Sequence, residues 1–397
     1  MEYLSTCMKK IVFTEEFCRP ENLFPFTLTR QIQDIRIGIL TIREKWEQYL
    51  GLSSFDKFEE DYKDLDRSVV IEEIDKDIIY LVHGNILPTQ KLIKQVKKLR
   101  PGEIISLAGK ETVVYCISKK EVVAENKIKV TKSVEMDEDL FEVAYPWNIF
   151  QLNAWAIKQD YELVTDGRKS QKTSSTNKLT GSQVFMEKGA AMEHCFLNSE
   201  DGPIYIGKNA TVMEGSMLRG PIAICEGATV KMGSKIYGAT TIGPNCIVGG
   251  EIKNSVLFGN SNKAHDGYLG DSVIGEWCNM GAGTSNSNIK NNASGVMVWT
   301  PGGPKTVGVK CGVVMGDYSR TAINTSINTG TVIGVCSNVY GSGLTPKYIP
   351  SFSWGSEGIE RYELEKAFTD IQAWKALKHQ TITENEKKIL KHIFDHY

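Results

Sequence analysis

Aliphatic residues recur at every sixth position along the middle of the chain. Starting from Ile206, they occupy Val212, Leu218, Ile224, Val230, Ile236, Ile242 and Val248. Neither an α-helix nor a plain β-strand has this period, so six residues form the repeating unit of a coil. The pattern predicts a left-handed parallel β-helix, in which three short strands per coil enclose the aliphatic side chains in a triangular prism. An ordinary β-sandwich is the alternative, but eight consecutive matches in one register favour the β-helix.

The aliphatic row resumes after an interruption. Its later members are Val309, Met315, Ile327, Ile333 and Val339. We therefore predict a β-helix over residues 183–345. The intervening segment, 285–304, is polar and rich in asparagine. An insertion of this length in a repeat usually protrudes from one corner and has a function of its own.

Residues 8–162 have the alternating pattern of an α/β domain. Short apolar runs predict strands at residues 10–13, 69–74, 78–82 and 111–118, and helical periodicity predicts helices at 89–99 and 147–161. We expect a compact Rossmann-like sheet of mixed or parallel strands covered by helices.

Two further segments complete the predicted organisation. Residues 163–182 are polar and lack periodicity, which predicts a linker. Residues 346–397 form a tail whose pattern predicts amphipathic helices at about 359–378 and 383–396. Phe352 and Trp354 precede these helices, and we expect them to close the end of the prism rather than to bind a ligand.

Bulk properties exclude several classes of protein. The chain has 397 residues and a net charge of −2, which gives no electrostatic reason for binding nucleic acid or a membrane. No apolar run approaches the roughly 20 residues of a spanning helix, and the first ten residues lack a signal-peptide core, so we expect a cytoplasmic protein. The nine cysteines include no CxxC pair, which indicates reduced thiols rather than disulfides or a metal site.

Basic residues follow the first predicted strand. Arg30, Arg36 and Lys45 lie where α/β proteins commonly bind phosphates, because strand ends and helix N-termini converge there. They predict a nucleotide site. The alternative is that Arg30 and Arg36 form ion pairs on a solvated face, with Asp34 or Asp64.

A specific motif interrupts the aliphatic row. Lys253 is followed twelve residues later by His265, then by Tyr268 in a Tyr-Leu-Gly-Asp run, then by Asn279-Met-Gly-Ala-Gly-Thr and by Asn288. This spacing resembles the acetyltransferase half of the bacterial bifunctional enzymes that join glucosamine-1-phosphate N-acetyltransferase to N-acetylglucosamine-1-phosphate uridylyltransferase. The resemblance is specific over about 181–343 and covers residues 10–160 only in outline.

The resemblance implies a role for each matching residue. His265 would be the general base for an amine attacking the thioester of acetyl-CoA, the co-substrate, and an imidazole with an ordinary pKa of about 6.5 suits this task. Lys253 would hold the sugar phosphate. Tyr268, Asn279 and Lys235 would also contact the sugar phosphate, with Arg219 as an alternative to Lys235. Ala282, Asn288, Lys305, Asp317 and Arg320 would face acyl-CoA. The family also implies a homotrimer with sites between subunits.

The sequence departs from the family at several positions. The glycine-rich nucleotide loop is missing after the first strand, where Phe13-Thr-Glu-Glu stands instead. Asn85 replaces the aspartate that helps to hold Mg²⁺ with a nucleoside triphosphate, Ile289 replaces a tyrosine, and Asp317 replaces a serine that lines the CoA site. A carboxylate at position 317 disfavours nearby anions.

Several functions follow from this sequence. The leading hypothesis is transfer of an acetyl group from acetyl-CoA to an amino-sugar phosphate, glucosamine-1-phosphate above all, in UDP-N-acetylglucosamine-type synthesis. The second is a sugar-1-phosphate nucleotidyltransferase, of uridylyltransferase or thymidylyltransferase type, with the prism as trimerisation scaffold. The third is a non-catalytic sugar-nucleotide-binding protein. A zinc carbonic anhydrase on the same prism needs three histidines, and the prism has only His194 and His265.

Overall fold

A computed structural model describes residues 9–15, 18–55, 71–107, 112–125, 127–136, 140–358 and 360–397. The chain forms two compact units. The N-terminal unit comprises Met1–Pro20, Gln31–Ile35 and Leu40–Ala144, and the prism unit comprises Glu21–Arg30, Arg36–Ile39 and Tyr145–Tyr397. The domain boundaries predicted from the sequence stay a prediction.

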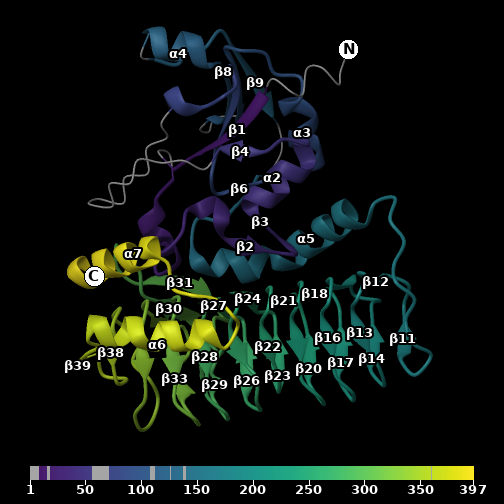
Figure 1. The fold of residues 1–397 in the computed structure, drawn as a ribbon, viewed down its shortest axis with the longest axis vertical. Helices are drawn as coiled ribbons and strands as arrows, with labels where there is room; N and C mark the ends of the chain where they lie inside the picture. The colour runs from purple at the N-terminus through teal and green to yellow at the C-terminus, as the bar shows by residue number, and fades with distance from the viewer. Residues whose placement is uncertain are drawn as a thin grey trace. The chain divides into compact units, whose positions relative to one another are not determined.

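A mixed six-stranded sheet forms the centre of the N-terminal unit (Figure 1). Its order is β4 (Ser54–Phe55), β1 (Lys9–Thr14), β5 (Ile78–His83), β8 (Thr112–Ser118), β7 (Glu103–Leu107) and β9 (Lys132–Met136). β1 pairs in parallel with β4 and β5, and β8 is antiparallel to β5 and β7. The remaining elements are β3 (Leu40–Thr41), α2 (Ile42–Leu50), β6 (Ile86–Leu87), α3 (Gln90–Val96), α4 (Lys119–Glu125), β10 (Phe141–Glu142) and the 3-10 turns η3 (Ile32–Asp34) and η5 (Ile71–Glu73).

Most predicted elements of this region are confirmed. β1, β5 and β8 match predicted strands, and α3 begins after the N-cap Thr89, whose hydroxyl accepts from the Leu92 amide at 3.0 Å. The strand predicted at 69–74 is wrong for its described residues, since 71–73 form a 3-10 turn with no buried side chain; residues 69 and 70 lie outside the described residues.

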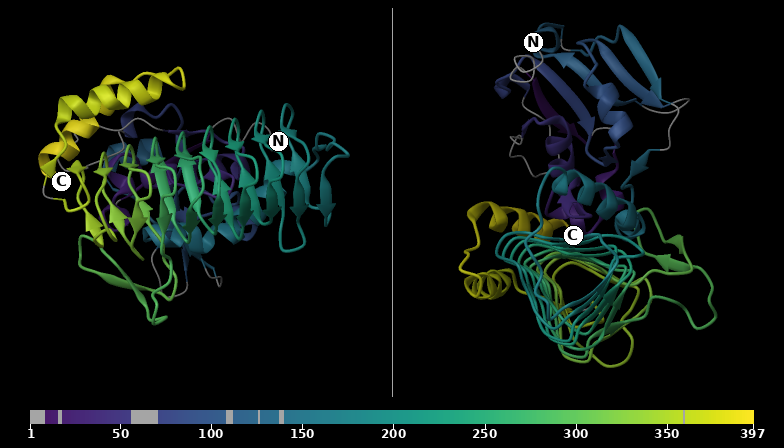
Figure 2. Two further views of the ribbon diagram at one scale, coloured as in Figure 1. Left: turned by 90° about the horizontal axis from the view of Figure 1, so that it is seen from below. Right: turned by 90° about the vertical axis from the view of Figure 1, so that its right-hand side faces the viewer.

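Three parallel sheets form the predicted prism, and its coils outline a triangle when viewed end-on (Figure 2). Sheet E contains β11 (Lys178–Thr180), β14 (Phe196–Asn198), β17 (Met217–Arg219), β20 (Lys235–Tyr237), β23 (Glu251–Lys253) and β26 (Tyr268–Gly270). Sheet F contains β12 (Val184–Met186), β15 (Ile204–Ile206), β18 (Ile222–Ile224), β21 (Thr240–Ile242), β24 (Val256–Gly259), β27 (Val273–Glu276), β32 (Val314–Met315), β35 (Val332–Ile333) and β37 (Tyr348–Ile349). Sheet G contains β13 (Ala191–Met192), β16 (Thr211–Val212), β19 (Thr229–Val230), β22 (Ile247–Val248), β25 (Asn262–Lys263), β28 (Asn279–Met280), β33 (Arg320–Thr321), β36 (Asn338–Val339), β38 (Ser353–Trp354) and the antiparallel β39 (Glu360–Arg361).

The interior of the prism explains the six-residue period. All eight aliphatic residues from Ile206 to Val248 are at most 2% exposed and belong to one continuous core. Glycine is required where coils stack closely: a Cβ on Gly243 would lie 1.9 Å from the Phe258 carbonyl oxygen. The fold class predicted from the sequence is thereby confirmed. The prediction that Val309 belongs to the interior row is wrong, because its side chain is 48% exposed. The interior row resumes at Met315.

The segment predicted to protrude forms a hairpin. After β29 (Ser285–Asn286), which pairs with β34 (Ser326–Ile327), the chain leaves the coils as antiparallel β30 (Val296–Val298) and β31 (Lys305–Gly308). Figure 2 shows this hairpin extending away from the prism.

Additional elements cover the prism. β2 (Arg36–Ile37), the 3-10 turns η1 (Pro20–Leu23) and η2 (Phe26–Leu28), and helices α5 (Pro146–Thr165), α6 (Leu364–Ala376) and α7 (Glu384–His396) complete the structure. α5 packs on sheet F, where the fully buried Asn153 amide donates to the Ala239 carbonyl at 2.7 Å. The two tail helices are confirmed, and Phe352 is fully buried with its ring 5.1 Å from that of Phe394. No described helix has the length and apolarity to cross a membrane.

Candidate functional site on the prism

The outer face of sheet E brings the predicted residues Lys235, Lys253 and Tyr268 together. Lys235, Glu251 and Tyr268 occupy one register row on β20, β23 and β26, and Tyr237 and Lys253 occupy the next row. Neighbouring strands lie about 4.8 Å apart, so these side chains are neighbours. The Lys253 ammonium lies 5.7 Å from the centre of the Tyr237 ring, and the Tyr237 hydroxyl donates to Glu251 at 2.7 Å.

A hydrogen-bonded cluster extends this face beyond β26. The Asn288 side-chain amide donates to the Tyr268 hydroxyl oxygen at 3.1 Å and also to the Asp271 carboxylate. Asp271 is 4% exposed and accepts a second bond, at 2.7 Å, from the side chain of Asn254. Burial and the nearby carboxylates of Asp271 and Glu251 raise the pKa of Tyr268 to about 12, so this hydroxyl is neutral at physiological pH.

Asp271 belongs to the candidate site, and the sequence reasoning did not single it out. Its carboxylate holds the Asn288 side chain beside the Tyr268 hydroxyl, although Asn288 lies one coil further along the chain than Tyr268. The Gly-Asp pair at the end of the Tyr-Leu-Gly-Asp run was the available signal. A positive φ of 48° places Asp271 at the prism corner, where a short polar side chain is favoured.

His265 lies at the next corner, between β25 and β26. Its side chain is exposed, and its carbonyl oxygen accepts a hydrogen bond from the ammonium of the buried Lys263. The neighbouring coil passes directly beside it, because the Gly283 amide donates to the Asp266 carbonyl at 3.0 Å. Ala282 is half-buried on that coil. His265 and Ala282 therefore stand on adjacent coils at one edge of the prism.

Asn279 and Arg320 lie on another face. They are register partners on β28 and β33 of sheet G, so the structure does not place them on sheet E with Lys253 and Tyr268. Arg320 is 9% exposed, and its guanidinium lies 5.4 Å from the centre of the Trp374 ring on α6. Asn279 accepts from the Asn262 side chain at 3.4 Å.

Arg30 and Asp317 form an ion pair, although the sequence assigned them to a nucleotide site and an acyl-CoA site. The Arg30 guanidinium contacts the 3%-exposed Asp317 carboxylate and lies 3.3 Å from a Glu276 oxygen. Thr29 donates to the same Asp317 carboxylate at 2.6 Å. This cluster attaches residues 21–30 to the prism. Lys305 lies on β31 with its ammonium 5.3 Å from the centre of the Tyr145 ring.

The other predicted nucleotide-binding residues belong to two different units. Arg36 donates to the carbonyl of Ile39 within the prism unit. Lys45 and Asn85 belong to the N-terminal unit, where Lys45 is 2% exposed and the Asn85 side-chain oxygen lies 3.3 Å from the Cys18 sulfur. The predicted partners also differ: Asp34 pairs with Arg43 at 2.6 Å, and Asp64 lies outside the described residues.

The described part of the chain has no group of three or more His, Cys, Asp or Glu side chains able to hold a metal ion. Magnesium needs oxygen ligands, usually carboxylates together with substrate phosphates. Asn85 is uncharged and would not supply one of these carboxylates.

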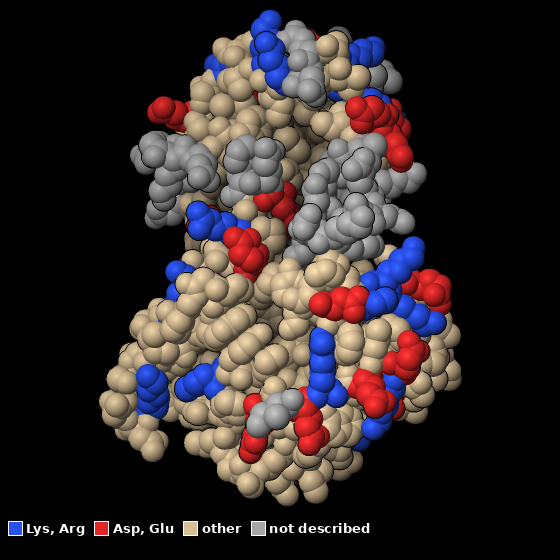
Figure 3. All heavy atoms as spheres, turned by 90° about the vertical axis from the view of Figure 1, so that its left-hand side faces the viewer, with Lys and Arg blue, Asp and Glu red and all other residues tan. Residues whose placement is uncertain are grey.

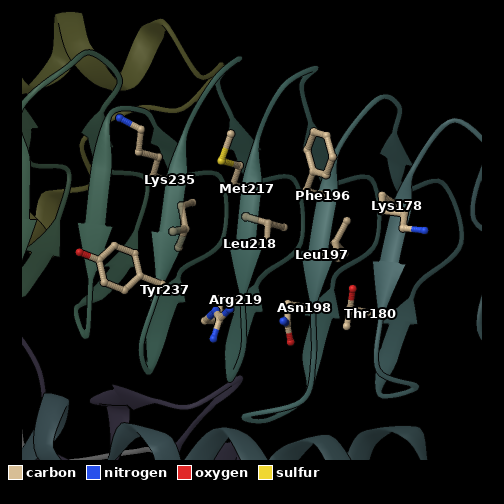
Figure 4. A pocket seen from close by; sticks show the side chains of 11 residues that line it. Lys178, Thr180, Phe196, Leu197, Asn198, Met217, Leu218, Arg219, Lys235 and Tyr237 are labelled. Atoms are coloured by element: carbon tan, nitrogen blue, oxygen red, sulfur yellow. The ribbon is translucent and has the colours of Figure 1, made fainter.

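A hollow of about 500 Å³ lies on sheet E (Figure 4). Its lining includes Lys235 and Tyr237, the register partners of Glu251 and Lys253, and continues over β17, β14 and β11. Elsewhere, Lys and Arg side chains are interspersed with Asp and Glu on the face drawn in Figure 3.

Comparisons with known proteins give the chain a family context. Residues 11–169 match the family model described as sugar nucleotidyl transferase. The "Bifunctional protein GlmU" of Methanococcus maripaludis is 37% identical over 97 residues, which is 24% of each chain. The chain is similar to the bifunctional GlmU proteins. The resemblance inferred from the sequence motif is thereby confirmed.

Further relatives have similar names and similar sequence identity. The "Bifunctional sugar-1-phosphate nucleotidylyltransferase/acetyltransferase" of Sulfurisphaera tokodaii is 38% identical over 91 residues, 23% of each chain. The GlmU protein of Synechococcus elongatus is 32% identical over 115 residues, covering 28% of this chain and 22% of that protein. The chain thus spans about a quarter of the length of the curated relatives it matches. The solved UDP-N-acetylglucosamine acyltransferase of Francisella novicida has 14% identity and a TM-score of 0.25, covering 56% of this chain and 87% of that one.

Proposed function

We propose that this chain is an acetyl-CoA-dependent N-acetyltransferase that acts on an amino-sugar phosphate, with glucosamine-1-phosphate as the reference acceptor. The observation that carries the proposal is the grouping of His265, Tyr268 and Lys253 on two adjacent coils of the prism. The name of the Sulfurisphaera tokodaii relative, which pairs a sugar-1-phosphate nucleotidylyltransferase with an acetyltransferase, supports it.

The chemistry assigns one task to each side chain. The exposed imidazole of His265 accepts a proton from the acceptor ammonium, so that the free amine attacks the thioester carbonyl. Lys253 binds the sugar phosphate through a charge-assisted hydrogen bond. Tyr268, held in place by Asn288 and Asp271, donates to a sugar oxygen. The Gly281-Ala282-Gly283 corner lets backbone amides approach the acyl group closely.

The other predicted contacts complete the proposal. Asn279 lies on a different sheet from Lys253, and in the cytoplasmic homotrimer that we propose it meets the ligand of an adjacent subunit, because sites then form between chains. Sedimentation velocity tests this arrangement, and a monomer at assay concentration contradicts it.

Thiol release from acetyl-CoA with glucosamine-1-phosphate tests acetyl transfer. We expect His265→Asn to lower kcat by about 10²- to 10⁴-fold, the usual effect of losing a general base. The matched control is His194→Asn, because His194 is another exposed prism histidine and asparagine tolerates its φ of 55°. Equal activity of His265→Asn and wild type would remove His265 from the chemistry.

A second function is favoured by the sugar nucleotidyl transferase match over residues 11–169. In this alternative the N-terminal unit transfers a nucleotide to a sugar-1-phosphate and the prism is a scaffold. Pyrophosphate release from UTP in the presence of N-acetylglucosamine-1-phosphate tests it. The His265→Asn variant should release pyrophosphate at the wild-type rate if the second function is present, and absence of release from wild type would exclude it.

A further inference from the structure

The hollow on sheet E lies in line with the proposed acceptor site, which comprises Lys253, His265 and Tyr268. One register row runs along the sheet through six strands: Lys178, Phe196, Met217, Lys235, Glu251 and Tyr268. At about 4.8 Å per strand, Lys235 is about 10 Å and Phe196 about 19 Å from Tyr268 along the row. A ligand bound at Tyr268 and extending along this row therefore passes Lys235 before it reaches Phe196.

The hollow has basic side chains close to the acceptor site. Lys235 is exposed and makes no ion pair within the described residues, and Lys253 lies one row away. Arg219 pairs with Asp201 at 3.2 Å, but both side chains are about 60% exposed, and a pair of this kind contributes little and exchanges readily. The nearby Glu251 carboxylate already accepts from Tyr237. Basic groups therefore outnumber acidic ones here, as an anionic ligand requires.

Two large apolar side chains lie beyond these cations. Phe196 and Met217 are 56% and 52% exposed, and they are register neighbours on β14 and β17. Figure 4 shows them in one row with Lys235, while Arg219 and Asn198 form a second row. A single exposed apolar residue needs no explanation, but two adjacent ones that line a hollow next to cations suit a flat ring with a charged neighbour.

We propose that this hollow binds a nucleoside diphosphate, so that the acetyl acceptor is a nucleotide-linked amino sugar. The sugar occupies the site of Lys253, Tyr268 and His265, the diphosphate lies along Lys235 and Arg219, and the base stacks on Phe196 and Met217. This inference rests on the proposed acetyl transfer. The reaction itself is unchanged: the amine nitrogen forms a bond to the acetyl carbon and the carbon–sulfur bond breaks. Of the two protons that the ammonium loses, one is released to water and the other passes through His265 to the departing CoA thiolate.

Acceptor preference provides the test of this proposal. Wild-type kcat/KM is measured with glucosamine-1-phosphate and with UDP-linked glucosamine, and we expect the UDP-linked acceptor to have a KM at least about tenfold lower. Phe196→Ala should raise KM for the UDP-linked acceptor by about 10- to 100-fold, the effect of losing one base–aromatic stack, and leave glucosamine-1-phosphate within twofold. Leu377→Ala, which alters an exposed residue of the tail, is the matched control and should change neither acceptor.

A binding measurement separates this inference from the function on which it rests. Titration calorimetry with UDP alone should show binding to wild type and its loss in Phe196→Ala. If neither acceptor is acetylated but UDP still binds through Phe196, the proposed function fails and the nucleotide site stands. Absence of UDP binding, equal effects of Phe196→Ala on both acceptors, or a change of oligomeric state in this variant would overturn the proposal. The last result would show that a second copy of the chain covers the apolar pair.

Discussion

Lys263 is the residue whose titration tests the structure most sharply. It is the register partner of Val248 and continues the interior row of sheet G formed by Val212, Val230 and Val248. Its side chain is 1% exposed, and its ammonium donates to the carbonyl oxygen of His265 and lies 3.5 Å from that of Gly249. The lysine thus occupies a position where other coils have an aliphatic residue, directly beneath the corner of His265.

Burial of this ammonium determines how strongly the free energy of unfolding depends on pH. Desolvation lowers the pKa of Lys263 from 10.5 to about 8, although the nearby Asp266 carboxylate favours the charged form. At about 1.4 kcal/mol per pKa unit, the charged form in the folded chain costs about 3 kcal/mol at neutral pH. Between the folded and unfolded pKa values the unfolded chain binds more protons, so the free energy of unfolding rises with pH. The expected gain between pH 7 and pH 9.5 is about 2 kcal/mol.

Urea unfolding of wild type and Lys263→Met across this pH range measures the gain. Methionine fills the same volume without a charge, so the difference between the two proteins isolates the lysine. Between about pH 7 and pH 9.5 we expect the free energy of unfolding of wild type to rise by about 2 kcal/mol more than that of Lys263→Met. Lys235→Met, at an exposed position, should show no such trend. A flat or falling difference curve for Lys263→Met would refute the buried position of the ammonium.

Two further perturbations test the packing of the prism unit. Arg30→Met leaves the Asp317 carboxylate buried without its cation and should lower the free energy of unfolding by about 3–5 kcal/mol. The double variant with Asp317→Asn should lose less stability than the sum of the two single variants. Additive losses in urea unfolding would argue against a direct ion pair. Ile242→Ala, at a fully buried interior position, should cost about 2–5 kcal/mol in the same assay, whereas Ile323→Ala, at a position 69% exposed, should stay within about 0.5 kcal/mol. Similar losses at both isoleucines would contradict the assigned interior.

The six-residue period was sufficient to predict the prism because each coil buries the same positions. The row from Ile206 to Val248 contains one residue per strand, and burial of large aliphatic side chains is the main favourable term in packing such coils. The period fails where corners change length. Val248 is followed in its sheet row by Lys263, fifteen residues later rather than eighteen, so the interior lysine was not visible in the pattern. Val309 was wrongly assigned for another reason: it directly follows β31 of the hairpin and lies outside the coils, although it is six residues before Met315.

The site was only partly predictable for a different reason. Lys253, His265 and Tyr268 are close in sequence, so a local motif was enough to predict that they lie on adjacent coils. The pairing of Arg30 with Asp317 joins residues that are 287 positions apart, and no local pattern shows such a contact. Placing Asn279 and Arg320 on sheet G likewise requires knowing which strand of each coil faces which side.

Acetyl transfer at the His265 corner is tested most directly by identifying the product. Wild-type protein is incubated with acetyl-CoA and either glucosamine-1-phosphate or UDP-linked glucosamine, and the sugar is analysed by mass spectrometry and by NMR of the new amide methyl group. We predict that wild type forms the N-acetylated sugar and that His265→Asn forms it about 10²- to 10⁴-fold more slowly. A folded wild-type protein that leaves the amine of both acceptors unmodified, or a fully active His265→Asn variant, would contradict the proposed function.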